Sequence, residues 1–137
     1  MQGSLRMSHL VVGAIAVVAF LITGQIMGRH DPPVGDMEWA ERLLFRSRHI
    51  YLLGAGLVNL ALGVNYRLPD GAARKGAAIA GSLLALASAL LLFFAFFAEP
   101  MAGRWPGALS MLGLQAMFAG VLLVTAASLF RRGRDAA

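Results

Sequence analysis

The stretch RSRHIYLLGAGLVNLALGVNY, from Arg46 to Tyr66, changes character after its fourth residue. It opens with cationic and titratable side chains and then becomes almost wholly apolar, with Asn59 near its middle. An apolar run of this length approaches the roughly 20 residues that an α-helix needs to cross the hydrocarbon core of a bilayer. The stretch therefore predicts a membrane-spanning helix that starts at a polar interface and carries an amide at depth.

Three further apolar runs surround this one, and the four runs, at 8–27, 49–66, 76–98 and 108–130, contain no Asp, Glu, Lys or Arg. A soluble helical bundle would carry a polar stripe on every helix, because each helix would face water. Of all residues 58% are hydrophobic and only 14% are charged, which is far from the balance of a soluble domain. We therefore predict an all-α, integral membrane four-helix bundle: a single transmembrane domain over 1–137 with spans at about 8–28, 47–66, 76–98 and 108–130.

The connections between the spans are expected to be short, apart from the one after the first span. We expect the first run to be a retained span rather than a cleaved signal peptide, because no small-residue cleavage site follows it. Pro32 and Pro33 then stop the helix, since proline lacks a backbone donor and disfavours helix in the residue before it. After Gly35, Glu38 and Arg42 form a favourable pair four residues apart, so a short interfacial helix is predicted to lead into the second span.

Cysteine is absent from the sequence, so disulfides, thiolate metal sites and thiol redox chemistry are excluded on this chain. The net charge of +5 is assigned to membrane topology rather than to nucleic-acid binding, because the basic residues flank apolar spans. One side of the membrane would hold Arg6, Arg67, Arg74, Lys75, Arg131, Arg132 and Arg134, and the other Arg29, Arg42, Arg46, Arg48 and Arg104. Since cytoplasmic loops are richer in Lys and Arg, this distribution predicts a bacterial inner (plasma) membrane protein with both termini in the cytoplasm.

Small residues and Asn59 predict how the helices pack. Within a bilayer, helices associate through close packing of small residues and through polar contacts. In the second span, Gly56, Asn59 and Gly63 share one face, which we expect to point into the bundle with the Asn59 amide bonded to a neighbouring helix. In the third span small residues recur at every fourth position, and this ridge is formed by Ala77, Gly81, Ala85 and Ala89.

Polar residues concentrate near the predicted outer ends of the spans. Ionisable residues at membrane depth often face protein or water and mark functional sites, so an outward-facing polar pocket is one hypothesis. Its predicted members are Gln25, Arg46, Arg48, His49, Glu99 and Gln115. The simpler interpretation is that Arg46 and Arg48 extend to the lipid headgroups and that Glu99 ends a helix.

The leading functional hypothesis is a non-catalytic accessory, assembly or structural subunit of a membrane complex. The ridges of small residues, the short loops and the scarcity of catalytic groups favour this class over an enzyme, and no residue is assigned a catalytic role. The expected partners are the lipid bilayer and either other membrane subunits or further copies of this chain.

A membrane redox protein that binds haem, quinone or copper is the first alternative. Haem in a helix bundle commonly has two axial histidines on facing helices. His30 and His49 are the metal-ligand candidates, because they lie on the same predicted side, whereas His9 lies at the opposite face. For copper, which also takes thioether ligands, they would be joined by Met27, Met37 and Met101. The further alternative is a small transporter or channel subunit, although transport sites usually involve broken helices or charges near the midplane.

Overall fold

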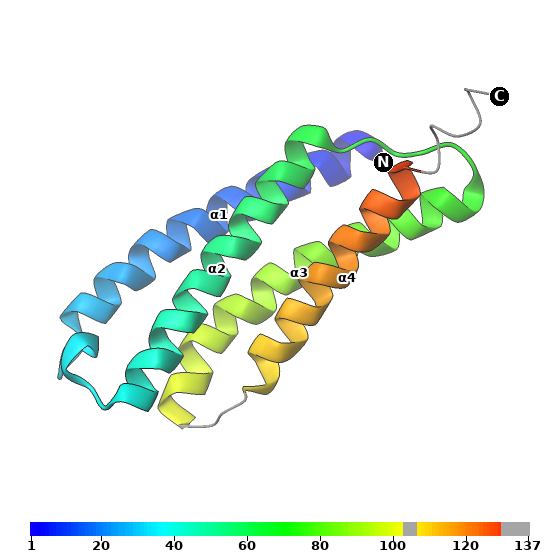
Figure 1. Cartoon of the computed structure of the whole chain (residues 1–137). Helices are drawn as coiled ribbons and strands as arrows, with labels where there is room; N and C mark the ends of the chain where they lie inside the picture. Colours follow the sequence, from blue (N-terminus) through cyan, green and yellow to red (C-terminus); the bar gives the residue numbers. More distant parts are fainter. Residues whose placement is uncertain (103–106, 130–137) are drawn as a thin grey trace.

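The computed structural model describes residues 1–102 and 107–129, and these residues form α-helices and one short 3₁₀ helix, with no strand among them. The elements are α1 (Gln2–Arg29), η1 (Val34–Asp36), α2 (Trp39–Asn65), α3 (Ala72–Ala102) and α4 (Ala108–Leu129). The helices lie side by side and alternate in direction (Figure 1). The predicted all-α four-helix bundle is therefore confirmed. Arg104, Phe130, Arg131, Arg132 and Arg134, and the side chain of Met101, lie outside the described residues.

The helices associate in sequential order. α1 packs mainly on α2, α4 packs mainly on α3, and α2 and α3 join the two pairs. The start of α1, the connection from α2 to α3 and the end of α4 lie at one end of the bundle, which we call the Arg67 end (Figure 1). The connection from α1 to α2, the end of α3 and the start of α4 lie at the opposite end, which we call the Glu99 end (Figure 1).

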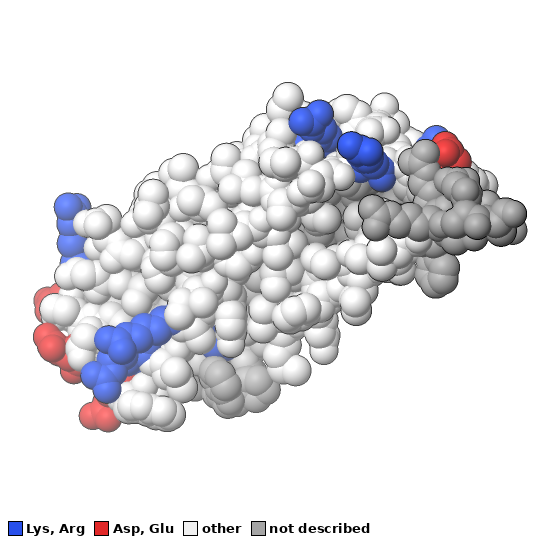
Figure 2. Space-filling model, turned by 45° about the horizontal axis from the view of Figure 1, so that its top comes forward, with Lys and Arg blue, Asp and Glu red and all other residues white. Residues whose placement is uncertain are grey.

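Three of the helices are long and apolar enough to cross a membrane, namely Gln2–Arg29, Ala72–Pro100 and Ala108–Leu129. Lys, Arg, Asp and Glu gather toward the two ends of the face shown in Figure 2, with an uncharged band between them. This distribution is that of an integral membrane protein. α2 as a fourth span stays a prediction: its outward face carries the exposed Ile50, Leu57 and Val64, but Arg48 and Asn59 lie on its buried side.

The first three helices are longer than the predicted spans, whereas α4 matches its span to within one residue. α2 continues without a break from Trp39 to Asn65, so the predicted interfacial helix and the second span form one helix. No Pro interrupts this segment, and the polar residues in its first turns do not oppose helix formation. α3 continues through Pro100 to Ala102, where a proline so close to the last turn removes only one backbone hydrogen bond.

Glycines allow the paired helices to approach closely. A Cβ atom at Gly13 would lie 2.7 Å from the backbone nitrogen of Leu60, and one at Gly81 would lie 2.7 Å from the carbonyl oxygen of Gly120. These separations are too short for any side chain, so backbone packs on backbone between α1 and α2 and between α3 and α4.

The small residues named from the sequence fall on three different contacts. Gly56 and Gly63 face α1, where they meet Val17 and Leu10 respectively. Gly81 and Ala85 lie against α4. Ala89 belongs to a buried cluster with Ala55, Leu92 and Met117, and Ala77 is half-buried.

Candidate functional site

A buried ion pair lies at the Glu99 end of the bundle. Arg48 on α2 donates from Nε to Oε2 of Glu99 on α3 at 2.8 Å. The two residues are only 1% and 6% exposed. Arg48 also donates from Nη1 to Oγ of Ser47 at 2.9 Å. Because a buried charge that loses its partner is costly, the pair fixes the rotation of α2 against α3.

The same carboxylate holds the start of α4. Oε1 of Glu99 accepts a hydrogen bond from the backbone N–H of Ser110, the third residue of that helix, at 2.9 Å. Gly107, which precedes α4, has no side chain that could cap it, and a Cβ atom there would overlap the Glu99 carboxylate. Glu99 therefore caps α4 from a different helix, and its negative charge is favourable at the positive end of the helix dipole. We call Ser47, Arg48, Glu99 and Ser110 the Arg48 cluster.

His49 follows Arg48 on α2 but turns toward α1. Its Nδ1 lies 3.0 Å from Oγ1 of Thr23, and that hydroxyl donates to the carbonyl oxygen of Phe20 at 3.0 Å. Since the hydroxyl has only one hydrogen, Nδ1 of His49 must carry the proton in the bond between them. The imidazole stacks on the Phe20 ring, with centroids 4.0 Å apart and an angle of 19° between the planes.

The structure brings together part of the predicted polar pocket. Arg48 and Glu99 are in direct contact, and His49 lies beside them along α2. Gln25, Arg46 and Gln115 lie on the exposed surface of their helices. A pocket that unites all six residues therefore stays a hypothesis, and the Arg48 cluster is the part that has direct contacts.

Of the two metal-ligand candidates, His30 lines a separate hollow, whereas His49 contacts Thr23 and Phe20 on α1. This hollow has a volume of about 550 Å³ and is lined on its apolar side by Phe45 and Pro100 and elsewhere by His30 and acidic residues. His30 donates from Nδ1 to the carbonyl oxygen of Pro32 at 3.1 Å, and its ring tilts against Phe45. Met27 and Met37 pack on the apolar cluster that contains Phe45. Within 1–102 and 107–129, no three His, Asp or Glu side chains are grouped so that they could hold a metal ion.

A second polar cluster lies deeper in the bundle, toward the Arg67 end. Asn59, which is fully buried, donates from Nδ2 to the carbonyl oxygens of Ala55 at 2.9 Å and of Ala85 on α3 at 3.0 Å. Its Oδ1 lies 2.7 Å from Nδ1 of His9 on α1. Because an amide oxygen can only accept, Nδ1 of His9 must carry the hydrogen. Asn59 therefore joins three helices through one side chain.

The other nitrogen of His9 has no hydrogen-bond partner. His9 is 0% exposed, and its Nε2 is the one buried side-chain nitrogen or oxygen without a partner among the described residues. The Tyr66 ring lies 5.6 Å away between centroids, and the Tyr66 hydroxyl accepts from Oγ of Ser82 at 2.9 Å. We call His9, Asn59, Tyr66 and Ser82 the His9 cluster. When the imidazole is neutral and its hydrogen is on Nδ1, as the bond to Asn59 requires, Nε2 carries a buried lone pair that can accept a hydrogen bond or bind a ligand.

The sequence alone did not predict the contacts of His9, Thr23 or Ser110. One pattern in the sequence points to the first two, because the buried face of α1 carries polar and small residues, namely His9, Gly13, Ala16, Ala19 and Thr23. Ser110 contributes its backbone N–H, which every residue at that position would supply. Its role therefore follows from the position of Glu99, and the residue type at position 110 does not indicate it.

These features define the class of the protein as an all-α integral membrane bundle whose buried polar side chains join its own helices. No protein-family model matches the chain, and no curated protein or solved structure is significantly similar to it.

Proposed function

We propose that the chain is a non-catalytic accessory, assembly or structural subunit that binds other membrane subunits or further copies of itself. The observation that carries this proposal is how the buried polar groups are used. Arg48 and Glu99 hold three helices together, and so does Asn59. Side chains committed to such bonds are not available for substrate, so the interior supports a scaffold more than an active centre.

The outer surface of the bundle supports the same proposal. Large apolar side chains are exposed on every helix, including Ile15, Leu57, Leu90 and Leu122. Between α1 and α3 this surface has an apolar hollow of about 200 Å³, floored by Leu52. A scaffold subunit needs such a surface, because lipid and partner helices both contact it through packing rather than through polar groups.

Native mass spectrometry after mild extraction from the original membrane tests the proposal. We expect a mass larger than that of the single chain. A photo-crosslinking residue at Ile15 or Leu90, beside the hollow, is compared with one at Leu122 on α4, and we expect protein adducts from at least one of these faces. A monomer that forms no adduct at any of the three positions would rule the proposal out.

The proposed topology places both termini in the cytoplasm of a bacterial inner membrane. It is supported by the count of Lys and Arg residues, because the predicted spans place more of them on the side of the membrane that holds Arg67 than on the side that holds Arg29. Because the chain has no cysteine, single cysteines at Asp31 and Asp70 can be labelled individually. A membrane-impermeant maleimide is expected to label Asp31→Cys in intact cells and Asp70→Cys only after permeabilisation. The reverse pattern would invert the topology.

A cofactor-binding membrane protein is the second candidate, and the buried lone pair of His9 favours it. Histidines that bind metals usually donate their other nitrogen to an oxygen, as Nδ1 of His9 does to Asn59. A single haem iron cannot take both His9 and His49. His49 contacts α1 at Thr23, fourteen residues beyond His9, which corresponds to roughly 21 Å along the helix. This candidate would therefore use His9 with an external ligand.

The second candidate is tested on protein purified from its own membrane. Absorption spectra, elemental analysis and quinone extraction are compared between the unchanged chain and His9→Leu. A cofactor that is present in the first and lost in the second, with helix content preserved, would support it. Colourless protein free of metal and quinone would reject it without affecting the scaffold proposal.

A further inference from the structure

A small hollow at the Arg67 end combines an apolar wall with a cationic rim. It lies between the end of α2 and the end of α4 and has a volume of about 250 Å³. Leu62, Val124 and Leu129 line its apolar side. Asn65, Arg67 and Thr125 line its polar side. α2 and α4 have few contacts with each other, so this hollow is a gap between two helices that each pack mainly on other neighbours.

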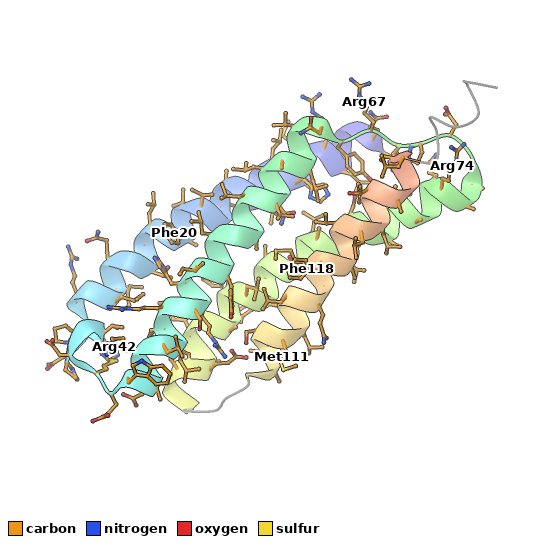
Figure 3. The ribbon with its side chains drawn as sticks, viewed as in Figure 1. Phe20, Arg42, Arg67, Arg74, Met111 and Phe118 are labelled. Carbon is orange, nitrogen blue, oxygen red and sulfur yellow. The ribbon has the colours of Figure 1, made fainter. Side chains whose placement is uncertain are left out.

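The charge around the hollow is positive. Arg67 lies two residues beyond Asn65, the last residue of α2, and its exposed side chain extends away from the bundle, while Arg74 lies nearby at the same end (Figure 3). Among the described residues, the ion pair is the one between Arg48 and Glu99 at the other end of the bundle. Arg67 therefore has no carboxylate partner among these residues. Asp70 is the one acidic residue at this end among those described, against Arg6, Arg67, Arg74 and Lys75.

Some of the hydrogen-bond donors at the rim already donate to backbone carbonyl oxygens of their own helices. Nδ2 of Asn65 donates to the carbonyl oxygen of Ala61 at 2.9 Å, and the Ser128 hydroxyl donates to that of Val124 at 2.8 Å. Among the described residues, the guanidinium of Arg67 and the exposed hydroxyl of Thr125 have no bonded partner and remain as donors toward an anion. A guanidinium binds a phosphate group through two parallel hydrogen bonds, which makes phosphate the anion that this rim fits best.

We propose that this hollow binds the phosphate of an anionic glycerophospholipid at Arg67 and Thr125, with one acyl chain lying against Leu62 and Val124 between α2 and α4. The apolar wall argues for a lipid, because a free phosphate ion would leave that wall exposed. The position fits as well, since the hollow lies where the apolar helix surface ends and the basic residues begin. Basic pockets between membrane helices are known to bind anionic headgroups in this way.

Native mass spectrometry in detergent measures this binding directly. Phosphatidylglycerol and phosphatidylcholine with identical acyl chains are titrated onto the purified chain. We expect phosphatidylglycerol to bind more tightly, and Arg67→Gln to weaken its binding by about fivefold, as expected for one interfacial cation. Arg29→Gln, which removes an exposed arginine at the opposite end, is the matched control and should leave binding unchanged.

A second variant pair tests the apolar part of the site. Thr125→Trp fills the hollow without removing a charge, whereas Leu122→Trp places the same side chain at another exposed position of α4. We expect loss of phosphatidylglycerol binding in the first and not in the second. Equal binding of the two lipids, equal effects of Arg67→Gln and Arg29→Gln, or displacement of the lipid by millimolar inorganic phosphate would each overturn the proposal.

Discussion

The carboxylate of Glu99 occupies the space that a Cβ atom of residue 107 would need, so Gly107 and Glu99 fit together only because position 107 has no side chain. This contact lets the end of α3 cap the start of α4, and Arg48 neutralises the same carboxylate from α2. Three helices are therefore joined by one acidic side chain.

Gly107→Ala is expected to destabilise the bundle, because its methyl group would displace the carboxylate that caps α4. Overpacking of this kind typically lowers the free energy of unfolding by about 1–3 kcal/mol. The measurement is unfolding in mixed micelles followed by circular dichroism. Gly76→Ala is the control, since a Cβ atom at Gly76 meets nothing within 4 Å and alanine favours the helix. Equal stability of the two variants would contradict the contact.

Removing Arg48 is expected to cost more than removing an exposed arginine. Arg48→Met leaves the Glu99 carboxylate buried without its cation, which should lower the free energy of unfolding by about 3–5 kcal/mol. Arg46→Met, an exposed residue on the same helix, should change it by less than about 0.5 kcal/mol.

The ion pair can be separated from the helix cap by a second substitution. In Arg48→Met with Glu99→Gln, no buried charge remains and the glutamine oxygen can still accept from the Ser110 N–H. We therefore expect the double variant to be more stable than Arg48→Met alone. Additive losses in the same unfolding experiment would show that the two side chains are not coupled.

Asn59→Leu is expected to loosen the contact among α1, α2 and α3. It removes the hydrogen bonds to His9 and to Ala85 and leaves the buried Nδ1–H of His9 without an acceptor. The expected loss in the free energy of unfolding is about 1–3 kcal/mol. Asn65→Leu is the matched control, because the Asn65 side chain is exposed and bonds only to Ala61 of its own helix among the described contacts. If both variants lose the same stability, Asn59 does not join the helices.

Gly120→Ala is expected to separate α4 from α3. The added Cβ atom would lie 2.6 Å from the carbonyl oxygen of Gly81 and 2.8 Å from the backbone nitrogen of Ala85, and neither atom can move without its helix. The free energy of unfolding should fall by about 1–3 kcal/mol. Gly54→Ala, where a Cβ atom meets nothing within 4 Å, should be neutral or slightly stabilising. A neutral Gly120→Ala would mean that the two backbones lie further apart.

The sequence predicted the helices well because hydropathy and helix breakers act locally. The apolar runs and the pair Pro32 and Pro33 were enough to place the four helices, and the all-α bundle follows from them. The helix ends were less predictable: α2 fuses the interfacial segment with the second span, and α3 passes through Pro100. The local hydropathy pattern does not indicate how far a helix continues into the polar residues beyond its apolar run.

The polar contacts were much less predictable, because they depend on how each helix is rotated about its axis. Arg48 and Glu99 were predicted to lie in one region but not to form an ion pair, and the hydrogen bond between His9 and Asn59 was not predicted. Gln25 and Gln115 have the same chemistry as buried amides, yet they lie on exposed faces.

The sequence by itself therefore determined the class of this protein, since about 20 apolar residues in a row can form little else than a membrane helix. Only the tertiary structure decided which buried groups meet. The helix pairing selected by Gly13 and Gly81 brings Asn59 to His9 and Glu99 to the start of α4. A hydrogen bond forms over about 3 Å, so its partners are fixed by the relative positions of whole helices and not by the residues that flank them.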